Sequence, residues 1–175
     1  MNRDRVPTAR LRRALVTWAS VVALAATGAA AAQADGVTFD VEILRVDLVV
    51  NDDGETVERF EPVTEAVPGE EIEYRVTVRN EGSRIYRPGT LPVRLPIGEG
   101  VRYVAGSVGP VDGDLVVDAS VDGGETFTSL PADPDADDGD ADAFDPAAVD
   151  TLRWTFTVPF EPGMERVLVY RVQVL

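Results

Sequence analysis

Residues 68–83 read PGEEIEYRVTVRNEGS and hold a turn, a strand and a second turn. Residues 71–79 alternate strictly between polar and apolar side chains, the pattern of a half-buried β-strand. The apolar positions are Ile72, Tyr74, Val76 and Val78, and the polar positions are Glu71, Glu73, Arg75, Thr77 and Arg79. We expect the polar face to be solvated, with cross-strand pairing and without a binding surface. The proline and glycine before the strand and the Asn-Glu-Gly-Ser after it suit turns.

The same pattern recurs along residues 35–175, with turn residues between the segments. Nine segments are predicted as strands: 39–50, 56–60, 70–80, 88–96, 101–108, 115–121, 126–130, 151–158 and 166–175. Residues 63–66 lie between two prolines and predict a short extended piece at a sheet edge. No segment after residue 34 has a helical period. We therefore predict one all-β domain, an antiparallel immunoglobulin-like β-sandwich of about 7–9 strands.

The first of these strands has an irregular apolar pattern. Its apolar positions shift by one residue at Ile43-Leu44, so the face that they define changes there. A β-bulge, or a strand that leaves one sheet and joins the other, would explain the shift. A strand that is apolar on both faces over its middle turn explains it equally well.

Residues 1–34 differ from the rest of the chain and predict a cleaved secretory signal peptide. A basic start is followed by an alanine-rich apolar run, and Ala32-Gln33-Ala34 places small residues where a signal peptidase reads. An uncleaved membrane anchor is the alternative, because residues 11–34 are just long enough to cross a bilayer as a helix. We expect export to the periplasm, the cell surface or the medium, with no stable membrane anchor after cleavage.

The charge of the chain limits its partners. The chain has 16 basic and 31 acidic residues; removal of residues 1–34 takes away five arginines and one aspartate, which leaves a net charge of −19. Such a surface repels phosphate backbones and anionic lipids, so nucleic acid is not an expected partner. Cations and basic proteins are better candidates. All basic residues are arginine, which a GC-rich coding bias together with a soluble exported surface would explain.

Residues 131–150 interrupt the strand pattern with eight aspartates and three prolines. Such a segment cannot bury enough apolar surface to offset the entropy of ordering it, so we predict a flexible acidic loop. Six aspartates form a nearly alternating series of oxygen ligands of the kind that calcium prefers: Asp133, Asp135, Asp137, Asp138, Asp140 and Asp142. An EF-hand is not expected, because Asp138 and Phe144 stand where that loop needs glycine and glutamate. A solvated loop and a weak calcium site remain as alternatives.

Five motifs in order resemble a known bacterial family. They are YRVTVRNEG at 74–82, LPIGEGVRYVAGSV at 95–108, SVDGGETF at 120–127, LRWTFTV at 152–158 and VYRVQV at 169–174. Together they resemble the conserved-repeat family of secreted and cell-surface immunoglobulin-like β-sandwich domains of unknown function. The resemblance implies a structural module of the cell surface or periplasm, often in tandem arrays, with no catalytic residues. The single copy and the aspartate-rich loop argue against a long stalk.

The residue types that are missing argue against an enzyme. The chain has no histidine, cysteine or lysine, which removes the imidazole base, the thiolate, the Schiff-base amine, and nitrogen and sulfur metal sites. A carboxylate pair of the glycosidase type cannot be singled out among so many acidic residues.

Aromatic residues give little indication of a binding face. Trp154 and Tyr170 fall on inward faces of predicted strands and are expected in the core. The remaining candidates for exposed aromatic side chains, Tyr86, Tyr103 and Phe127, are scattered along the chain. Tyr86 stands between Arg84 and Arg87, a group that could recognise an acidic partner or protect an edge strand. We therefore expect a non-enzymatic structural or interaction module, with a weak calcium-binding module as the alternative.

Overall fold

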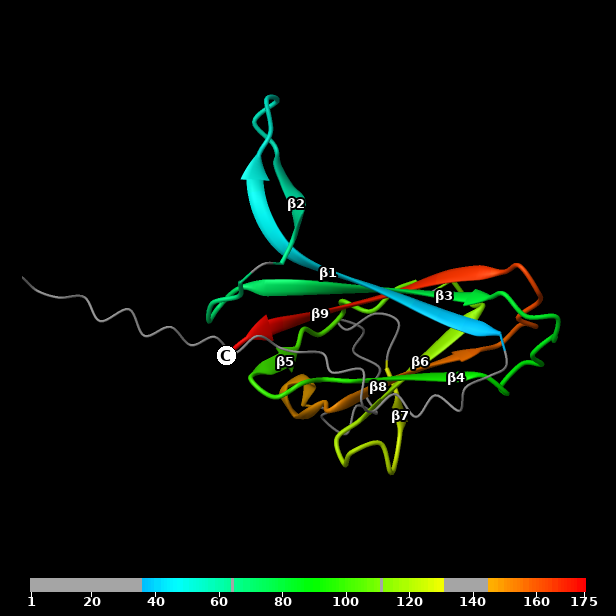
Figure 1. Ribbon diagram of the computed structural model, residues 1–175. Coiled ribbons are helices and arrows are strands. Elements are labelled where there is room, and N and C mark those ends of the chain that lie inside the picture. Colours follow the sequence, from blue (N-terminus) through cyan, green and yellow to red (C-terminus); the bar gives the residue numbers. More distant parts are fainter. Residues whose placement is uncertain (1–35, 64, 111, 131–144) are drawn as a thin grey trace, which may run out of the picture.

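The computed structural model describes residues 36–63, 65–110, 112–130 and 145–175. Within these ranges the protein is all-β, with nine strands in two antiparallel sheets (Figure 1). The strands are β1 (Val37–Val50), β2 (Thr56–Pro62), β3 (Glu71–Asn80), β4 (Pro92–Pro96), β5 (Val101–Tyr103), β6 (Leu115–Ser120), β7 (Thr128–Ser129), β8 (Thr151–Phe156) and β9 (Glu165–Val174). A 3-10 turn, η1 (Pro146–Ala148), precedes β8. The predicted all-β, antiparallel class is confirmed.

The strictly alternating segment forms β3, at the centre of the larger sheet. That sheet has the order β2-β1-β3-β9-β5, and the smaller sheet has the order β4-β8-β6-β7. Each strand pairs antiparallel with its neighbours. β3 is therefore hydrogen-bonded on both edges, to β1 and to β9, over nearly its whole length.

The core lies between the two sheets and is formed by the alternating apolar positions. β3 and β9 bring Tyr74 and Tyr170 directly opposite each other, and their rings stack with centroids 4.9 Å apart. The ring of Trp154 from β8 lies 5.9 Å from Tyr170, which confirms that both belong to the core. Full burial of such a side chain contributes on the order of 1.5–3 kcal/mol. Burial, together with the neighbouring Tyr74, raises the pKa of Tyr170 far above its ordinary value, so its hydroxyl stays neutral.

β1 contains neither a bulge nor a change of sheet. Its pairing with β3 runs in one register from Val37 to Val46, and its pairing with β2 runs in one register from Leu44 to Val50. After Val46, where the pairing with β3 stops, β1 and β2 continue as a two-stranded ribbon that stands out from the sandwich (Figure 1). Residues 43–47 are half-buried on both faces. The apolar shift at Ile43-Leu44 therefore marks a strand with two covered faces at the base of this ribbon.

Most of the smaller predicted strands are shorter than expected. The segment 101–108 is a strand only over β5, although Gly109 forms an isolated bridge with Val169. The segment 126–130 is reduced to β7, and the described residues of 63–66 form no strand. In contrast, β3, β8 and β9 have strict alternation and are close to their predicted lengths.

Asn80 fixes the turn that ends β3. Its side chain is fully buried; Nδ2 donates to the carbonyl oxygens of Arg84 and Phe160, and Oδ1 accepts from the amide of Gly82. Gly36 reaches the same turn, where its carbonyl oxygen accepts from Glu81 and Gly82. A Cβ on Gly36 would lie 2.4 Å from Cα of Gly82, so only glycine allows this approach.

Replacement of Asn80 by alanine should remove the two hydrogen bonds that its side-chain amide donates to the carbonyls of Arg84 and Phe160. We expect Asn80→Ala to lower the free energy of unfolding by about 2–4 kcal/mol, measured by urea denaturation. Asn51→Ala is the matched control, because Asn51 Oδ1 accepts only amides of an exposed turn. Its cost should be below about 1 kcal/mol. Equal losses for the two variants would contradict the proposed role of Asn80.

Candidate binding surface

The aspartate series of the acidic loop lies outside the described residues. Asp133, Asp135, Asp137, Asp138, Asp140 and Asp142 all fall within residues 131–144. Among the residues that the structure does describe, no group of three or more acidic side chains is arranged to hold a metal ion. The weak calcium site therefore stays a prediction from the sequence.

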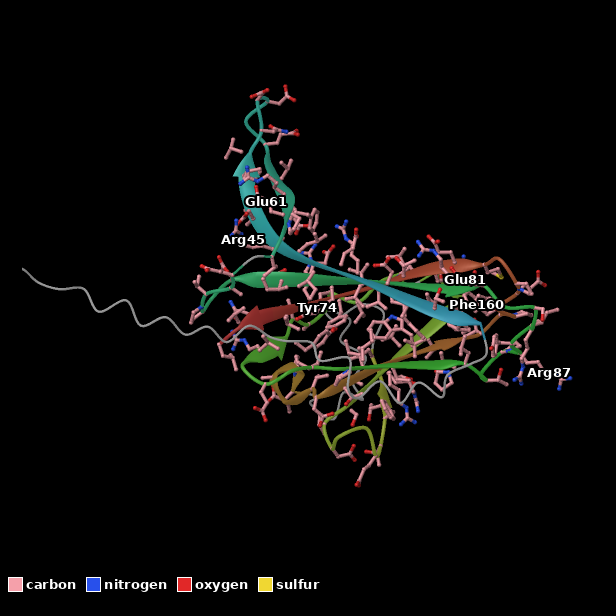
Figure 2. The ribbon with its side chains drawn as sticks, viewed as in Figure 1. Arg45, Glu61, Tyr74, Glu81, Arg87 and Phe160 are labelled. Carbon is pink, nitrogen blue, oxygen red and sulfur yellow. The ribbon has the colours of Figure 1, made fainter. Side chains whose placement is uncertain are left out.

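The aromatic side chains do not form an exposed platform in the part of the chain that is described. Tyr86 and Tyr103 were candidates for exposure, but both are buried. The backbone of Tyr86 pairs with that of Phe160, and its ring contacts the guanidinium of Arg84. Arg87 points away from the end of the sandwich (Figure 2). The Arg84, Tyr86 and Arg87 group is thus a covered tyrosine flanked by arginines.

Phe60 of β2 lies over the outer face of the larger sheet, between two arginines. The guanidinium of Arg75 lies 4.5 Å from the ring centroid of Phe60, and that of Arg171 lies 5.8 Å away. Both arginines bind Glu73, with Nε of Arg75 at 2.6 Å and Nε of Arg171 at 2.8 Å from its carboxylate oxygens. Arg171 also binds Glu58 and Glu71. We call Glu58, Phe60, Glu73, Arg75 and Arg171 the β2 clamp.

Glu73 corrects an expectation from the sequence. Its position on the polar face predicted a solvated side chain, but Glu73 is only 3% exposed. Two guanidinium groups and the ring of Phe60 cover this part of the sheet. A carboxylate can be buried in this way because both of its oxygens are hydrogen-bonded to cations.

The smaller sheet carries a similar arrangement on its own outer face. The ring centroid of Phe127 lies 4.0 Å from the guanidinium of Arg153 and 5.1 Å from that of Arg94. Arg153 binds the buried Asp118 at 2.6 Å, and Ser129 donates to the same carboxylate. We call Arg94, Asp118, Phe127 and Arg153 the Phe127 clamp. Phe127 is half-buried, and its ring contacts two arginines of the protein itself, so it does not form an exposed aromatic platform.

The turn before Phe127 is organised by Asp122. Its carboxylate accepts from the hydroxyl and amide of Thr126, from the hydroxyl of Ser120 and from the amide of Glu125. These hydrogen bonds, led by that of the Thr126 hydroxyl, lower the pKa of Asp122 to about 2. The Asp-Gly-Gly-Glu sequence thus forms the predicted turn and brings Phe127 back over the sheet.

Five of the eleven large apolar side chains that are exposed among the described residues lie on β1 and β2. Leu48 and Val50 are 71% and 70% exposed near the tip of the ribbon. Closer to the sandwich, Phe39 and Val41 are 41% and 38% exposed. A shallow hollow at the other end of the larger sheet is lined by Arg79, whose guanidinium is held by Glu165. The ribbon and the adjoining part of β1 are therefore the surfaces best suited to a partner.

No helix in the described ranges has the length and apolar character needed to cross a membrane. No family model, curated protein or solved structure matches the chain. The resemblance to the conserved-repeat family therefore stays a prediction based on its sequence motifs.

Replacement of Arg171 should show how much the protein is destabilised when the buried carboxylate of Glu73 loses one of its two arginine partners. We expect Arg171→Leu to lower the free energy of unfolding by about 2–3 kcal/mol, because Arg75 alone then neutralises the buried carboxylate. The double variant Arg171→Leu/Glu73→Leu should recover part of this loss. Arg102→Leu is the control, since Arg102 is exposed and bonds only to Gln173. A double variant less stable than Arg171→Leu would contradict the proposed pairing.

The same variant should respond to pH in a defined direction. The hydrogen bond from Arg171 lowers the pKa of Glu58 below its ordinary value of 4.5. A lowered pKa stabilises the folded state above the unfolded-state pKa, and this contribution is lost as the pH falls through the folded-state pKa. The difference in stability between the wild type and Arg171→Leu should therefore narrow below pH 4.5. A difference that widens there would be evidence against the clamp.

Proposed function

We propose that this protein is a non-enzymatic interaction module that binds another protein through the β1–β2 ribbon. The observation that carries the proposal is the exposure of Leu48 and Val50, two large aliphatic side chains on a structured projection. Apolar groups gathered on a projecting element mark contact sites more often than single scattered ones do. Polar neighbours, Glu58 and the turn at residues 51–55, surround them.

The ribbon is held at its base, which favours binding without a large loss of entropy. Arg45 of β1 binds Glu61 of β2 at 3.0 Å and Asp47 at 3.2 Å, and it reaches Glu70 of the sandwich at 3.6 Å (Figure 2). The β2 clamp fastens the other strand through Glu58 and Phe60. A contact surface that is ordered before binding keeps more of its interaction energy as affinity.

Several further observations support a module rather than an enzyme. The chain lacks histidine, cysteine and lysine, and the carboxylates of both clamps are bound to arginines. Signal-like residues 1–34 support export, and the motifs of the conserved-repeat family support a place at the cell surface or in the periplasm. The net charge of −15 favours a partner whose contact surface is basic or neutral.

Photo-crosslinking in the cells that produce the protein tests the ribbon. A photoreactive residue at position 48 should give a discrete crosslinked protein, and the same residue at position 116 should not. Val116 is the control because it is exposed on the outer face of the smaller sheet. Leu48→Ser/Val50→Ser should compete poorly for the same partner while its melting temperature stays near that of the wild type. Identical crosslinks at both positions would overturn the proposal.

Weak calcium binding at the aspartate series is the second candidate function, supported by the spacing of the six residues. A thermal melt with and without millimolar calcium separates the two candidates, because a ligand that binds only the folded state raises the melting temperature. For an interaction module without a calcium site we expect no shift. A rise that disappears when Asp133, Asp135, Asp137, Asp138, Asp140 and Asp142 are changed to asparagine would favour the calcium site.

A further inference from the structure

We propose that the open edge of β1 over residues 37–43 pairs with an extended segment of a partner protein, which adds to the sheet as a further β-strand. In that partner segment, basic residues alternate with apolar ones. The inference rests on the proposed function as a binding module, but it uses a surface separate from the ribbon tip. β2 pairs with β1 only from Leu44 onward, whereas β3 pairs with it from Val37. Among the described residues, no strand lies beside residues 37–43 on the side away from β3.

The hydrogen-bonding phase of β1 shows which main-chain groups face this edge. The amide of Glu81 donates to the carbonyl of Gly36, so the main-chain groups of residue 36 point toward β3. Along a strand these groups point alternately to its two sides, so the even-numbered residues of β1 face β3 and the odd-numbered ones face away from it. The carbonyl of Ile43 accepts from Val63, which confirms that Ile43 points away from β3. By the two-residue period, the amides and carbonyls of Val37, Phe39 and Val41 also point to the open edge. They are positioned to pair with a further strand.

The side chains along the edge define the chemistry of that strand. Phe39 and Val41 lie on the face of Val76 and Val78, partly exposed because the smaller sheet does not cover them completely. The opposite face carries Thr38, Asp40 and Glu42, all exposed. A strand that pairs here would place one row of side chains beside the apolar pair and the other row beside two carboxylates. Apolar residues alternating with arginine or lysine satisfy both rows.

Each of the other described edge strands is short or carries proline or arginine; β2, an edge strand of the larger sheet, contains Arg59 and ends at Pro62. β4 has prolines at both ends, and β5 and β7 have only three and two residues. Residues 37–43 contain no proline, arginine or lysine, and the pairing with β3 has no bulge. Natural proteins usually block long flat edges with such devices. The only charges on this edge of seven residues are the carboxylates of Asp40 and Glu42, which oppose an acidic strand but favour a basic one.

A second copy of this chain is a poor occupant. Antiparallel self-pairing centred on residue 40 places Asp40 opposite Asp40, and pairing centred on residue 41 places Asp40 opposite Glu42. Like charges directly opposite each other destabilise a pair of strands, and the net charge of −15 opposes the approach of two copies. A basic segment has neither problem.

Titration of the full chain with synthetic peptides tests the proposal. The probe is a capped peptide of four Arg-Val repeats, and the matched probe has four Glu-Val repeats. We expect the Arg-Val peptide to bind at least about tenfold more tightly than the Glu-Val peptide, with affinity that falls as salt rises. Amide NMR shifts should be largest at residues 37–43. Equal binding of the two peptides, or shifts centred elsewhere, would overturn the proposal.

Two changes separate main-chain pairing from simple charge attraction. Val41→Pro removes an amide that faces the edge and should weaken Arg-Val binding about tenfold, whereas Val41→Ala keeps the amide and should weaken it much less. An Arg-Val peptide N-methylated at alternate residues tests the same point with the protein unchanged, and one of the two N-methylation patterns should abolish binding. Binding that survives both N-methylation patterns would sink the proposal.

The outcomes also distinguish this edge from the ribbon. Leu48→Ser/Val50→Ser should leave peptide binding unchanged, because those side chains lie beyond residues 37–43. Peptide binding without a specific crosslink at position 48 would contradict the ribbon proposal alone. A specific crosslink at position 48 without peptide binding would contradict the edge proposal alone.

Discussion

The pairing of β3 with β9 is the interaction on which the rest of the sandwich depends. It places Tyr74 opposite Tyr170 on the inner face and Glu73 opposite Arg171 on the outer face. The two rings of the inner pair stack on each other, and Tyr170 also contacts the tilted ring of Trp154, which joins the smaller sheet to the larger one. The outer pair forms the ionic centre of the β2 clamp and so fixes the ribbon. One ladder therefore organises both faces, because alternate residues of a strand point in opposite directions.

The local patterns of the sequence predicted much of this fold. Strict alternation located β3, β8 and β9, and the Asp-Gly sequences located the turns after β1 and β6. The burial of Glu73 could not be predicted in the same way. It depends on Phe60 of β2, a strand that is not next to β3 in the sheet, on the nearby Arg75, and on Arg171, which is 98 residues away along the chain. Alternation shows which residues share a face, but it does not show what covers that face.

The candidate binding surfaces show the same limit. The sequence drew attention to the aspartate series, because clustered carboxylates are visible in one dimension. The open edge of β1 depends instead on where β2 ends against its partner, which only the register reveals. The arginine-only composition also gains a physical role here. A planar guanidinium can stack on a phenylalanine and bind a carboxylate at the same time, and Arg75, Arg153 and Arg171 all do so.

The central position of β3 also determines how the domain would carry a mechanical load. β1 and β9 are both antiparallel to β3, so they run parallel to each other, and residues 36 and 175 lie at opposite ends of the larger sheet. A pull between these two ends acts along the strands and loads both ladders in shear. Many hydrogen bonds then have to break together, whereas a pull across a sheet opens them one at a time. The two ladders on either side of β3 would therefore resist such a pull as a unit.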